Sequence, residues 1–198
     1  CYDSNNDYFY VGLSNTDDSA QKILTLNNKL EIIQTTDLAE PALHLNTITY
    51  NPDTNELITI RSSGYELLVI NLSTGTVTPK VSLTDFNSGI QYDPVLKVYV
   101  GINGPAISGT VNWNYRIYDA AFNVIRTGTF QNPYGYTNNE TPNGFSCYDG
   151  KMVHSSFTTN GVQFGIANRV QFLFGVDYFG NVSKIYQEFL SGMEYEGV

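Results

Sequence analysis

The sequence predicts an all-β fold, a β-propeller of four blades with four antiparallel strands in each blade. A tyrosine that ends an apolar-alternating strand, followed by a polar turn and a second apolar strand, occurs four times. These tyrosines, Tyr2, Tyr50, Tyr92 and Tyr148, lie 48, 42 and 56 residues apart. A period of roughly 40–50 residues with several short strands per unit is typical of propeller blades. The sequence shows no helical period of useful length.

Each repeat unit contains two hairpins. Residues 47–60 form the clearest first hairpin, with apolar strands on both sides of an Asn-Pro-Asp-Thr-Asn turn. A second hairpin of the same kind follows in each unit, with Asn, Asp or Gly in the turn. We therefore expect one propeller domain over 1–198, with blades at about 1–40 plus 193–198, 41–85, 86–131 and 141–190.

The innermost strand of the first unit is short because the sequence begins at its end. Residues Glu196-Gly197-Val198, joined head to tail to Cys1-Tyr2-Asp3, would make this strand complete, as in Ser88-Gly89-Ile90 of the third unit. Closure of a ring in this way removes exposed strand edges, which invite aggregation. The sequence predicts that both termini meet in one blade, and the alternative is a fragment of a larger propeller.

Charge and composition exclude several classes of partner. The net charge is −9 with only ten Lys and Arg residues, whereas nucleic-acid binding depends on basic patches. No apolar run reaches the length of a membrane span, so membrane insertion is not expected. Cys1 and Cys147 occupy similar places in two different units and should lie too far apart for a disulfide, so both are expected to be free thiols.

The sequence offers no catalytic or metal-binding motif. His44 and His154 are the only histidines, and they fall on different strands that are not expected to converge. A Gly-x-Ser-x-Gly nucleophile elbow is absent. Asp3, Asp53, Asp93 and Asp149 follow the inner strands, where Asx-turn geometry explains them. We therefore assign no catalytic residue, metal or cofactor.

Two groups of residues are candidates for binding. The first consists of polar residues that enter the innermost strands and would line the axial channel: His44, Asn46, Asn87, Asn143, Glu194 and Glu196. Convergent polar groups at such an opening suit a ligand site. The alternative is that they satisfy buried backbone groups and hold water.

The second group lies in two long insertions. Residues 103–113 contain Trp113, and residues 131–142 contain Tyr134 and Tyr136. Loops on rigid scaffolds carry function, and aromatic rings with nearby amides suit sugars or protein surfaces. Alternatively, Trp113 caps a blade.

The joined segment Glu196-Gly197-Val198-Cys1-Tyr2-Asp3 and the segment from His44 to Pro52 resemble the propeller domains in tail and receptor-binding proteins of phages that infect Gram-positive bacteria. The resemblance covers nearly the whole chain as a diffuse repeat pattern. It implies a host-surface platform on a virion or outside the cell, commonly a homotrimer through regions outside this chain, that recognises cell-wall glycopolymers. This chain has fewer blades than that group.

The function expected from these observations is a non-enzymatic binding module for a cell-surface glycan, a cell-wall polymer or a protein. One alternative is a lactonase-like hydrolase or lyase that uses Glu196, His44 and Asn143 around the channel. Another is a structural spacer that only assembles its neighbours.

Overall fold

The computed structural model describes residues 1–15, 20–39, 47–61, 66–83, 89–103, 112–134, 140–158 and 169–190. These residues form four sheets of four strands, and within these ranges there is no helix. In each sheet the strands follow chain order and every neighbouring pair is antiparallel, so each sheet is one propeller blade. The predicted four-bladed, all-β fold is confirmed. Residues 191–198, on which the predicted closure rests, lie outside the described ranges.

The strands of the four blades are as follows. Blade 1 contains β1 (Tyr2–Asp3), β2 (Tyr8–Ser14), β3 (Gln21–Leu26) and β4 (Ile32–Asp37). Blade 2 contains β5 (Ile48–Asn51), β6 (Glu56–Arg61), β7 (Glu66–Ile70) and β8 (Val77–Ser82). Blade 3 contains β9 (Gly89–Asp93), β10 (Val98–Asn103), β11 (Asn112–Tyr118) and β12 (Val124–Gln131). Blade 4 contains β13 (Glu140–Tyr148), β14 (Lys151–Thr158), β15 (Arg169–Asp177) and β16 (Val182–Leu190).

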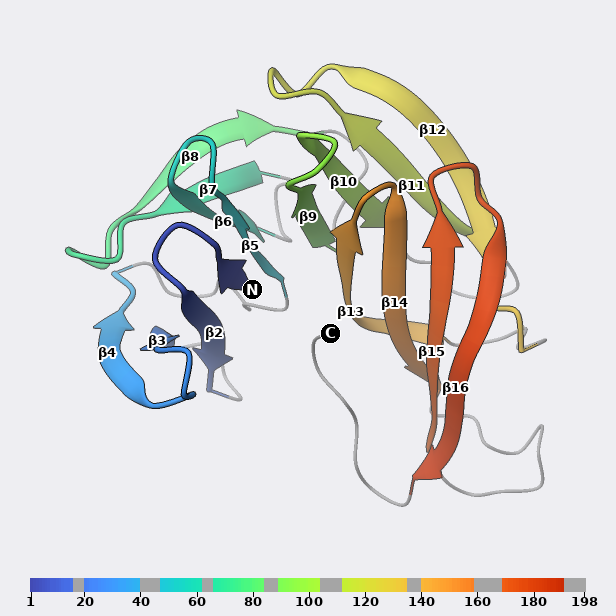
Figure 1. The fold of residues 1–198 in the computed structure, drawn as a ribbon, viewed down its shortest axis with the longest axis horizontal. Coiled ribbons are helices and arrows are strands. Elements are labelled where there is room, and N and C mark those ends of the chain that lie inside the picture. Colours follow the sequence, from blue (N-terminus) through green and yellow to red (C-terminus); the bar gives the residue numbers. More distant parts are fainter. Residues whose placement is uncertain are drawn as a thin grey trace.

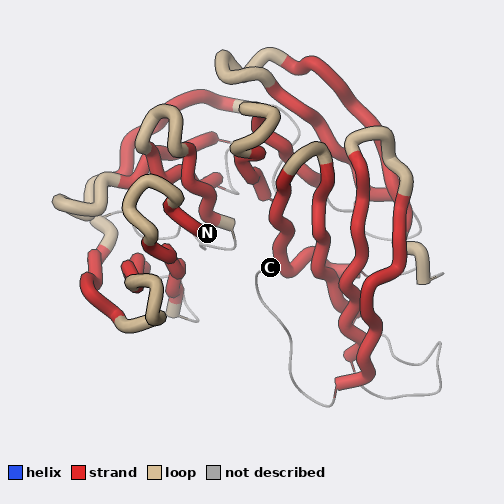
Figure 2. The backbone as a smooth tube through the Cα atoms, in the orientation of Figure 1, coloured by secondary structure: helices blue, strands red, loops and turns tan. Residues whose placement is uncertain are grey.

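Burial falls from the innermost strand of a blade to the outermost. All four residues of β5 are buried, whereas β4, at the outer edge of blade 1, is exposed at every position except Thr36. Figures 1 and 2 show the blades arranged around a centre, with β5, β9 and β13 toward the axis and β4, β8, β12 and β16 outside. Side chains on the inner strands therefore determine which chemical groups a ligand at the axis would contact.

The turns between the first two strands explain why the repeat is visible in the sequence. In blades 1 to 3 the inner strand ends at Asp3, Asn51 or Asp93, and the side-chain Oδ1 of each accepts the N–H groups two and three residues later. The last residue of each four-residue turn has a positive φ, as at Asn55 with 56°. An Asx residue thus fixes each of these turns, as the sequence predicts for Asp3 and Asp93. In blade 2 this residue is Asn51 and not the predicted Asp53, whose carboxylate binds Tyr92 and Lys97 instead.

The corresponding turn in blade 4 is shorter, so the alignment of the four repeats on their tyrosines fails there. Tyr148 pairs with Lys151 across a two-residue turn made by Asp149 and Gly150, which have φ angles of 49° and 77°. By strand register, Tyr148 takes the place of Asp93, and Cys147 takes the place of Tyr92. The expected equivalence of Tyr148 with the other tyrosines is therefore wrong by one residue, because the shorter turn shifts the register.

Three apolar clusters hold successive blades together. The first joins blades 1 and 2 around Tyr10, Ile23 and Leu57. The second joins blades 2 and 3, and the third, which joins blades 3 and 4, is the richest in aromatic rings. Burial of apolar area is the main favourable term in folding, so the blade interfaces position the inner strands. The part of the chain that the structure describes holds no helix with the length and apolarity needed to span a lipid bilayer.

Candidate functional site

The innermost strands of the four blades enclose an axial cavity of about 790 Å³. Its size falls in the range of small-molecule sites, roughly 300–1,000 Å³. Each blade contributes residues from its first strand or the segments next to it, and blade 1, whose first strand is short, also contributes residues of β2. The lining comprises Cys1, Tyr2, Ser4, Tyr10, Val11 and Gly12 from blade 1; Thr47, Ile48, Thr49, Tyr50 and Pro52 from blade 2; Gln91, Tyr92, Pro94 and Val95 from blade 3; and Gly144, Phe145, Ser146, Cys147 and Tyr148 from blade 4.

The described lining is rich in tyrosine, and none of its side chains is a carboxylate, an ammonium, a guanidinium or an imidazole. This contrasts with the net charge of −9 for the chain. Aromatic rings provide apolar faces, and the hydroxyl and amide groups of Ser146, Thr49 and Gln91 provide donors and acceptors. Such a lining suits an uncharged ligand with hydroxyl groups.

Part of the polar lining is already used to align the inner strands. Thr49 Oγ1 accepts the backbone N–H of Tyr92 at 2.8 Å, and Gln91 Nε2 donates to the carbonyl of Ile48 at 3.2 Å. These bonds join β5 to β9 directly. They fix the spacing between the inner strands of blades 2 and 3 and thereby the width of the cavity.

Thr47, by contrast, has a hydroxyl without a partner. The residue precedes β5 and is 5% exposed, and its Oγ1 makes no hydrogen bond in the structure. A buried hydroxyl without a partner carries a free-energy penalty of about 1–3 kcal/mol.

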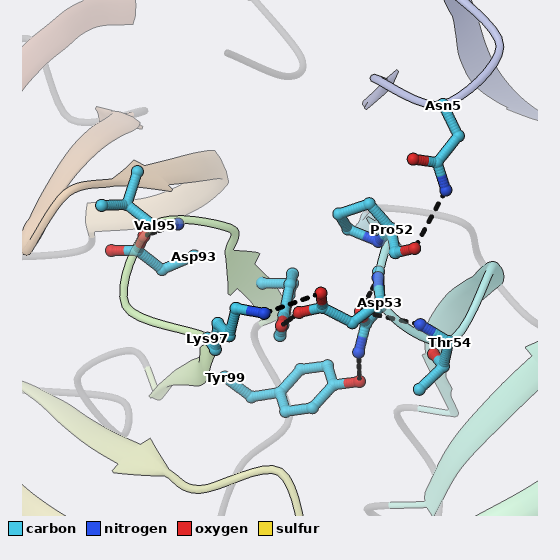
Figure 3. A network of polar contacts seen from close by, with 10 residues as sticks. Asn5, Pro52, Asp53, Thr54, Asp93, Val95, Lys97 and Tyr99 are labelled. Carbon is cyan, nitrogen blue, oxygen red and sulfur yellow. Dashed lines mark hydrogen bonds and ion pairs between the residues drawn. The ribbon is translucent and has the colours of Figure 1, made fainter.

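Hydrogen bonds between blades surround the turn end of the cavity. Asn51 Nδ2 donates to the hydroxyl of Tyr99 at 2.6 Å, and the hydroxyl of Tyr178 donates to Asp93 Oδ2 at 2.8 Å. In each pair the Asx residue that ends one inner strand binds a tyrosine of the next blade. Figure 3 shows Tyr99 close to the turn that contains Pro52, Asp53 and Thr54. The predicted structural role of Asp93 is thus seen directly.

Asp53 makes a further link between blades 2 and 3. Its carboxylate accepts the hydroxyl of Tyr92 at 2.5 Å and the ammonium of Lys97 at 3.0 Å (Figure 3). These two hydrogen bonds hold the pKa of Asp53 below its usual value, while burial and the Asp53 charge raise the pKa of Tyr92. Asn5 Nδ2 makes the corresponding link from blade 1, to the carbonyl of Pro52 at 2.9 Å.

The carboxylate of Asp93 is fully buried and strongly hydrogen-bonded. Burial alone would raise its pKa, but the N–H of Gly150, the hydroxyl of Tyr178 and the turn N–H groups that it accepts outweigh burial and lower the pKa. Asp93 is therefore a charged structural residue with its oxygens occupied. Its oxygens are therefore not available to bind a ligand. The same holds for Asp3, which accepts hydrogen bonds from the hydroxyl of Tyr10 and from the N–H groups of Asn5 and Asn6.

Trp113 lies in the core rather than in a loop. The structure begins β11 at Asn112, so the expectation that Trp113 belongs to a loop insertion is wrong. Its ring is fully buried, 4.5 Å from the ring of His154 and parallel to Phe130 at 6.1 Å. Cross-strand pairing of Trp113 with Phe130 explains why the strand begins at Asn112, inside the segment 103–113 that the sequence predicts to be an insertion. This burial favours the alternative in which Trp113 packs a blade.

Tyr134 is fixed against blade 4. Its ring stacks on Phe172 at 5.5 Å, and its hydroxyl donates to the carbonyl of Leu173 at 3.2 Å. Lys184 Nζ lies 5.2 Å from the centre of the same ring. Tyr134 is half-buried, so one part of the ring is held in place while another part faces out.

The structure does not place the other predicted binding residues. Tyr136, His44, Asn46, Asn87, Glu194 and Glu196 lie outside the described ranges, and only the backbone of Asn143, in β13, lies within them. Their role stays a prediction. Among the residues that the structure does describe, His, Cys, Asp and Glu side chains form no cluster of three that could hold a metal ion. Cys1 and Cys147 are free thiols, as predicted.

Sequence reasoning missed most of the residues that line the cavity. Thr49, Gln91 and Ser146 occupy the same position of three inner strands, one residue before Tyr50, Tyr92 and Cys147. The small or amide-bearing polar residue that recurs at this repeat position could have indicated in the sequence which residues line the cavity. Thr47 had no signal, because its unpartnered hydroxyl depends on which residues pack around it.

Comparisons with known proteins support the fold and leave activity open. No family model and no curated protein matches the chain. Among solved structures, the Kuenenia stuttgartiensis hydrazine synthase is similar at 13% identity with a TM-score of 0.54, over 93% of this chain and 52% of that one. A putative TolB from Agrobacterium tumefaciens is similar at 12% identity with a TM-score of 0.51, over 95% of this chain and 64% of that one.

A further structure, the Cps50 (Swd1) β-propeller domain of Myceliophteria thermophila, has 8% identity and a TM-score of 0.43 over 99% of this chain and 86% of that one. The chain spans about half the length of the hydrazine synthase chain and less than two thirds of the TolB chain. At these identities the likeness shows a shared fold alone. The fold and the axial cavity define a β-propeller of the kind that serves as a binding or structural module.

Proposed function

We propose that this chain is a non-enzymatic binding module that recognises a glycan of a cell surface, and that the axial cavity is where the glycan binds. The observation that carries the proposal is the lining of the cavity: tyrosines with hydroxyl and amide groups, and no charged side chain among the described lining residues. A sugar has apolar C–H faces that pack on aromatic rings, and hydroxyl groups that need donors and acceptors.

The resemblance to receptor-binding propellers of phages that infect Gram-positive bacteria supports a cell-wall glycopolymer as the ligand and a virion or extracellular location. An uncharged lining would recognise the sugar units of such a polymer, while its phosphates would stay in solvent, because burial of an unpaired charge is costly. The net charge of −9 also disfavours electrostatic attraction between the chain and the phosphates of the polymer.

Binding is favoured over catalysis by the same lining. Acid–base or nucleophilic chemistry requires a positioned base or an activated nucleophile. The one buried thiol there, Cys147, has a pKa raised by burial, and a raised pKa disfavours the reactive thiolate. We therefore propose no reaction for this cavity.

The test is retention of the purified chain by intact Gram-positive cell walls, before and after the walls are stripped of their teichoic acids. We expect retention on intact walls and its loss on stripped walls. Equal retention on both walls would contradict a glycopolymer ligand, and no retention on either would favour a spacer.

A variant that fills the cavity locates the site. Ser146 lines the cavity and is half-buried, so Ser146→Phe should occupy ligand space with little disturbance of the strands. We expect retention to fall while the unfolding midpoint stays near that of the wild type. The matched control is Thr127→Phe on the exposed outer strand β12, which should retain binding.

A further inference from the structure

We propose that the glycan lies across the mouth of the axial cavity with one sugar unit on the ring of Tyr148, and that the ammonium of Lys151 binds a phosphate next to that unit. This inference rests on the proposed function and specifies it further. It assigns Tyr148 and Lys151 as the pair that recognises a phosphate-bearing sugar, and it leaves the phosphates of the polymer at the protein surface.

The cavity opens at the turn end of the inner strands. The lining residues next to the turns are exposed, namely Tyr2, Ser4, Pro94, Val95 and Tyr148. Tyr148 has the most exposed ring among them, at 66%. Thr47 and Phe145, which line the cavity further from the turns, are only 5% and 1% exposed. Within the described part of the chain, a ligand therefore reaches the cavity at the turn end.

The short turn of blade 4 places an aromatic ring and an ammonium side by side at this mouth. Tyr148 and Lys151 are paired residues on either side of the turn made by Asp149 and Gly150. Directly opposite residues of an antiparallel pair project from the same face, with Cβ atoms about 4.5–5.5 Å apart. The C–H face of a sugar can pack on the ring, while a phosphate beside that sugar lies within reach of the ammonium.

The Lys151 ammonium is available to a ligand. It is exposed and forms no ion pair or hydrogen bond within the residues that the structure describes. By contrast, Lys97, at the end of the corresponding turn in blade 3, is bound to Asp53 at 3.0 Å. An exposed ammonium can bind a phosphate without burial of either charge, so no large desolvation cost arises.

Two carboxylates near Lys151 limit the strength of this contact. Asp177 lies opposite Lys151 in β15, but its oxygens accept the N–H groups of Phe179 and Asn181 and the side-chain amide of Asn181. Asp149, in the turn, is exposed. Both negative charges oppose an approaching phosphate. We therefore expect Lys151 to change affinity by a few fold and not by orders of magnitude.

The position of the charges favours a polymer that lies across the mouth. A chain that pointed into the cavity would carry its phosphates past Ile48 and Phe145, where the described lining holds no cation. Burial of such an unpaired charge is costly. A chain across the mouth keeps its phosphates in solvent near Lys151, while one sugar unit contacts Tyr148 and the hydroxyl of Ser146.

The experiment measures affinity by titration calorimetry with three probes. These are a single phosphate-bearing repeat unit of the wall teichoic acid, the same unit after treatment with phosphatase, and inorganic phosphate. The variants are Lys151→Gln, which removes the charge at similar length, and Tyr148→Ala. The matched control is Lys29→Gln, which makes the same charge change at an exposed lysine in the turn between β3 and β4.

We expect Lys151→Gln to weaken the phosphate-bearing unit by about threefold to fivefold and to leave the dephosphorylated unit unchanged. This loss should vanish at roughly 0.5 M salt, because salt screens charges at the surface. Tyr148→Ala should weaken both units roughly tenfold. Lys29→Gln should match the wild type, and inorganic phosphate should bind far more weakly than the phosphate-bearing unit.

Three results would overturn the inference while the proposed function stands. Equal effects of Lys151→Gln and Lys29→Gln on the phosphate-bearing unit would remove the role of Lys151. Unchanged affinities in Tyr148→Ala would remove the role of the ring. Inorganic phosphate that bound as tightly as the unit would indicate a general anion site. Failure of the wild type to bind either unit would overturn the glycan function itself, and the inference with it.

Discussion

The hydroxyl of Tyr178 donates to Asp93 Oδ2 at 2.8 Å and so links blade 4 to the innermost strand of blade 3. Both groups are buried, and Asp93 also accepts the N–H groups of Asp149 and Gly150 from the turn of blade 4. A carboxylate buried with several donors is stabilising only while those donors stay in place. This contact therefore couples the geometry of the cavity to the packing of its blades.

Tyr178→Phe tests that coupling. Asp93 would keep its backbone donors, so we expect the free energy of unfolding to fall by about 1–2 kcal/mol, near the low end for a hydrogen bond to a charged group. Urea denaturation measures it. The control Tyr2→Phe removes a hydroxyl that donates to the exposed Asp7 and should change stability little. Equal effects of both variants would contradict a special role for the buried bond.

Acid should weaken the protein through His154. The imidazole is completely buried among the rings of Trp113, Phe130 and Phe174, and burial lowers its pKa from 6.5 to about 3. Because the unfolded chain binds this proton more readily, stability is full above pH 6.5 and falls as pH drops toward 3. One proton corresponds to about 1.4 kcal/mol per pH unit.

His154→Phe separates this contribution from the rest. The phenyl ring suits an aromatic cluster and cannot titrate, so the free energy of unfolding should be nearly flat between about pH 5.5 and 4.5. This range lies below the titration of the Cys1 amine, whose pKa burial lowers from 8.0 to about 6. Below about pH 4 the variant should also lose stability, because Asp3 and Asp93 have lowered pKa values and must then take up protons to unfold. A wild-type slope retained in the variant would contradict the assignment to His154.

Trp113 should behave as a core residue. Trp113→Ala would leave a cavity between blades 3 and 4, and we expect a loss of about 3–5 kcal/mol in the free energy of unfolding. Because this is the only tryptophan, fluorescence of the wild type reports on it alone. We expect blue-shifted emission with little quenching by iodide, and no change on binding of wall fragments. Strong quenching would contradict burial.

Hydrogen exchange at Gly12 tests the predicted closure of blade 1. The backbone of Tyr10 exchanges two hydrogen bonds with Cys1, both at 2.8 Å, so the next inward-facing backbone groups on β2 are those of Gly12. If Glu196-Gly197-Val198 continue the inner strand, as the sequence predicts, the Gly12 N–H should exchange as slowly as the Tyr10 N–H. Fast exchange at Gly12 beside slow exchange at Tyr10 would contradict closure by this segment.

The sequence was sufficient for the fold because the blade turns repeat a local chemical signal. Asp3, Asn51 and Asp93 fix their turns with their own side chains, so the repeat can be read without tertiary information. The offset at Tyr148 and the early start of β11 at Asn112 could not be read in the same way. Both depend on strand register, which the packing of blade 4 against blade 3 determines.

The site was only partly predictable. An axial opening lined by polar groups follows from the propeller architecture, and the sequence indicated it. The individual residues did not follow, because Thr49, Gln91 and Ser146 resemble ordinary alternating strand residues. The unpartnered hydroxyl of Thr47 packs closely against Gly89, 42 residues further along the chain, and no local pattern reveals this contact.

Binding of a glycan in the axial cavity is tested by titrating the isotope-labelled protein with short wall oligosaccharides and recording nuclear magnetic resonance spectra. We expect the largest shift changes on the cavity residues Thr47, Gln91, Ser146 and Tyr148, and we expect Ser146→Phe to abolish these changes. Shift changes confined to the outer strands β4, β8, β12 and β16 would contradict the axial cavity as the binding site.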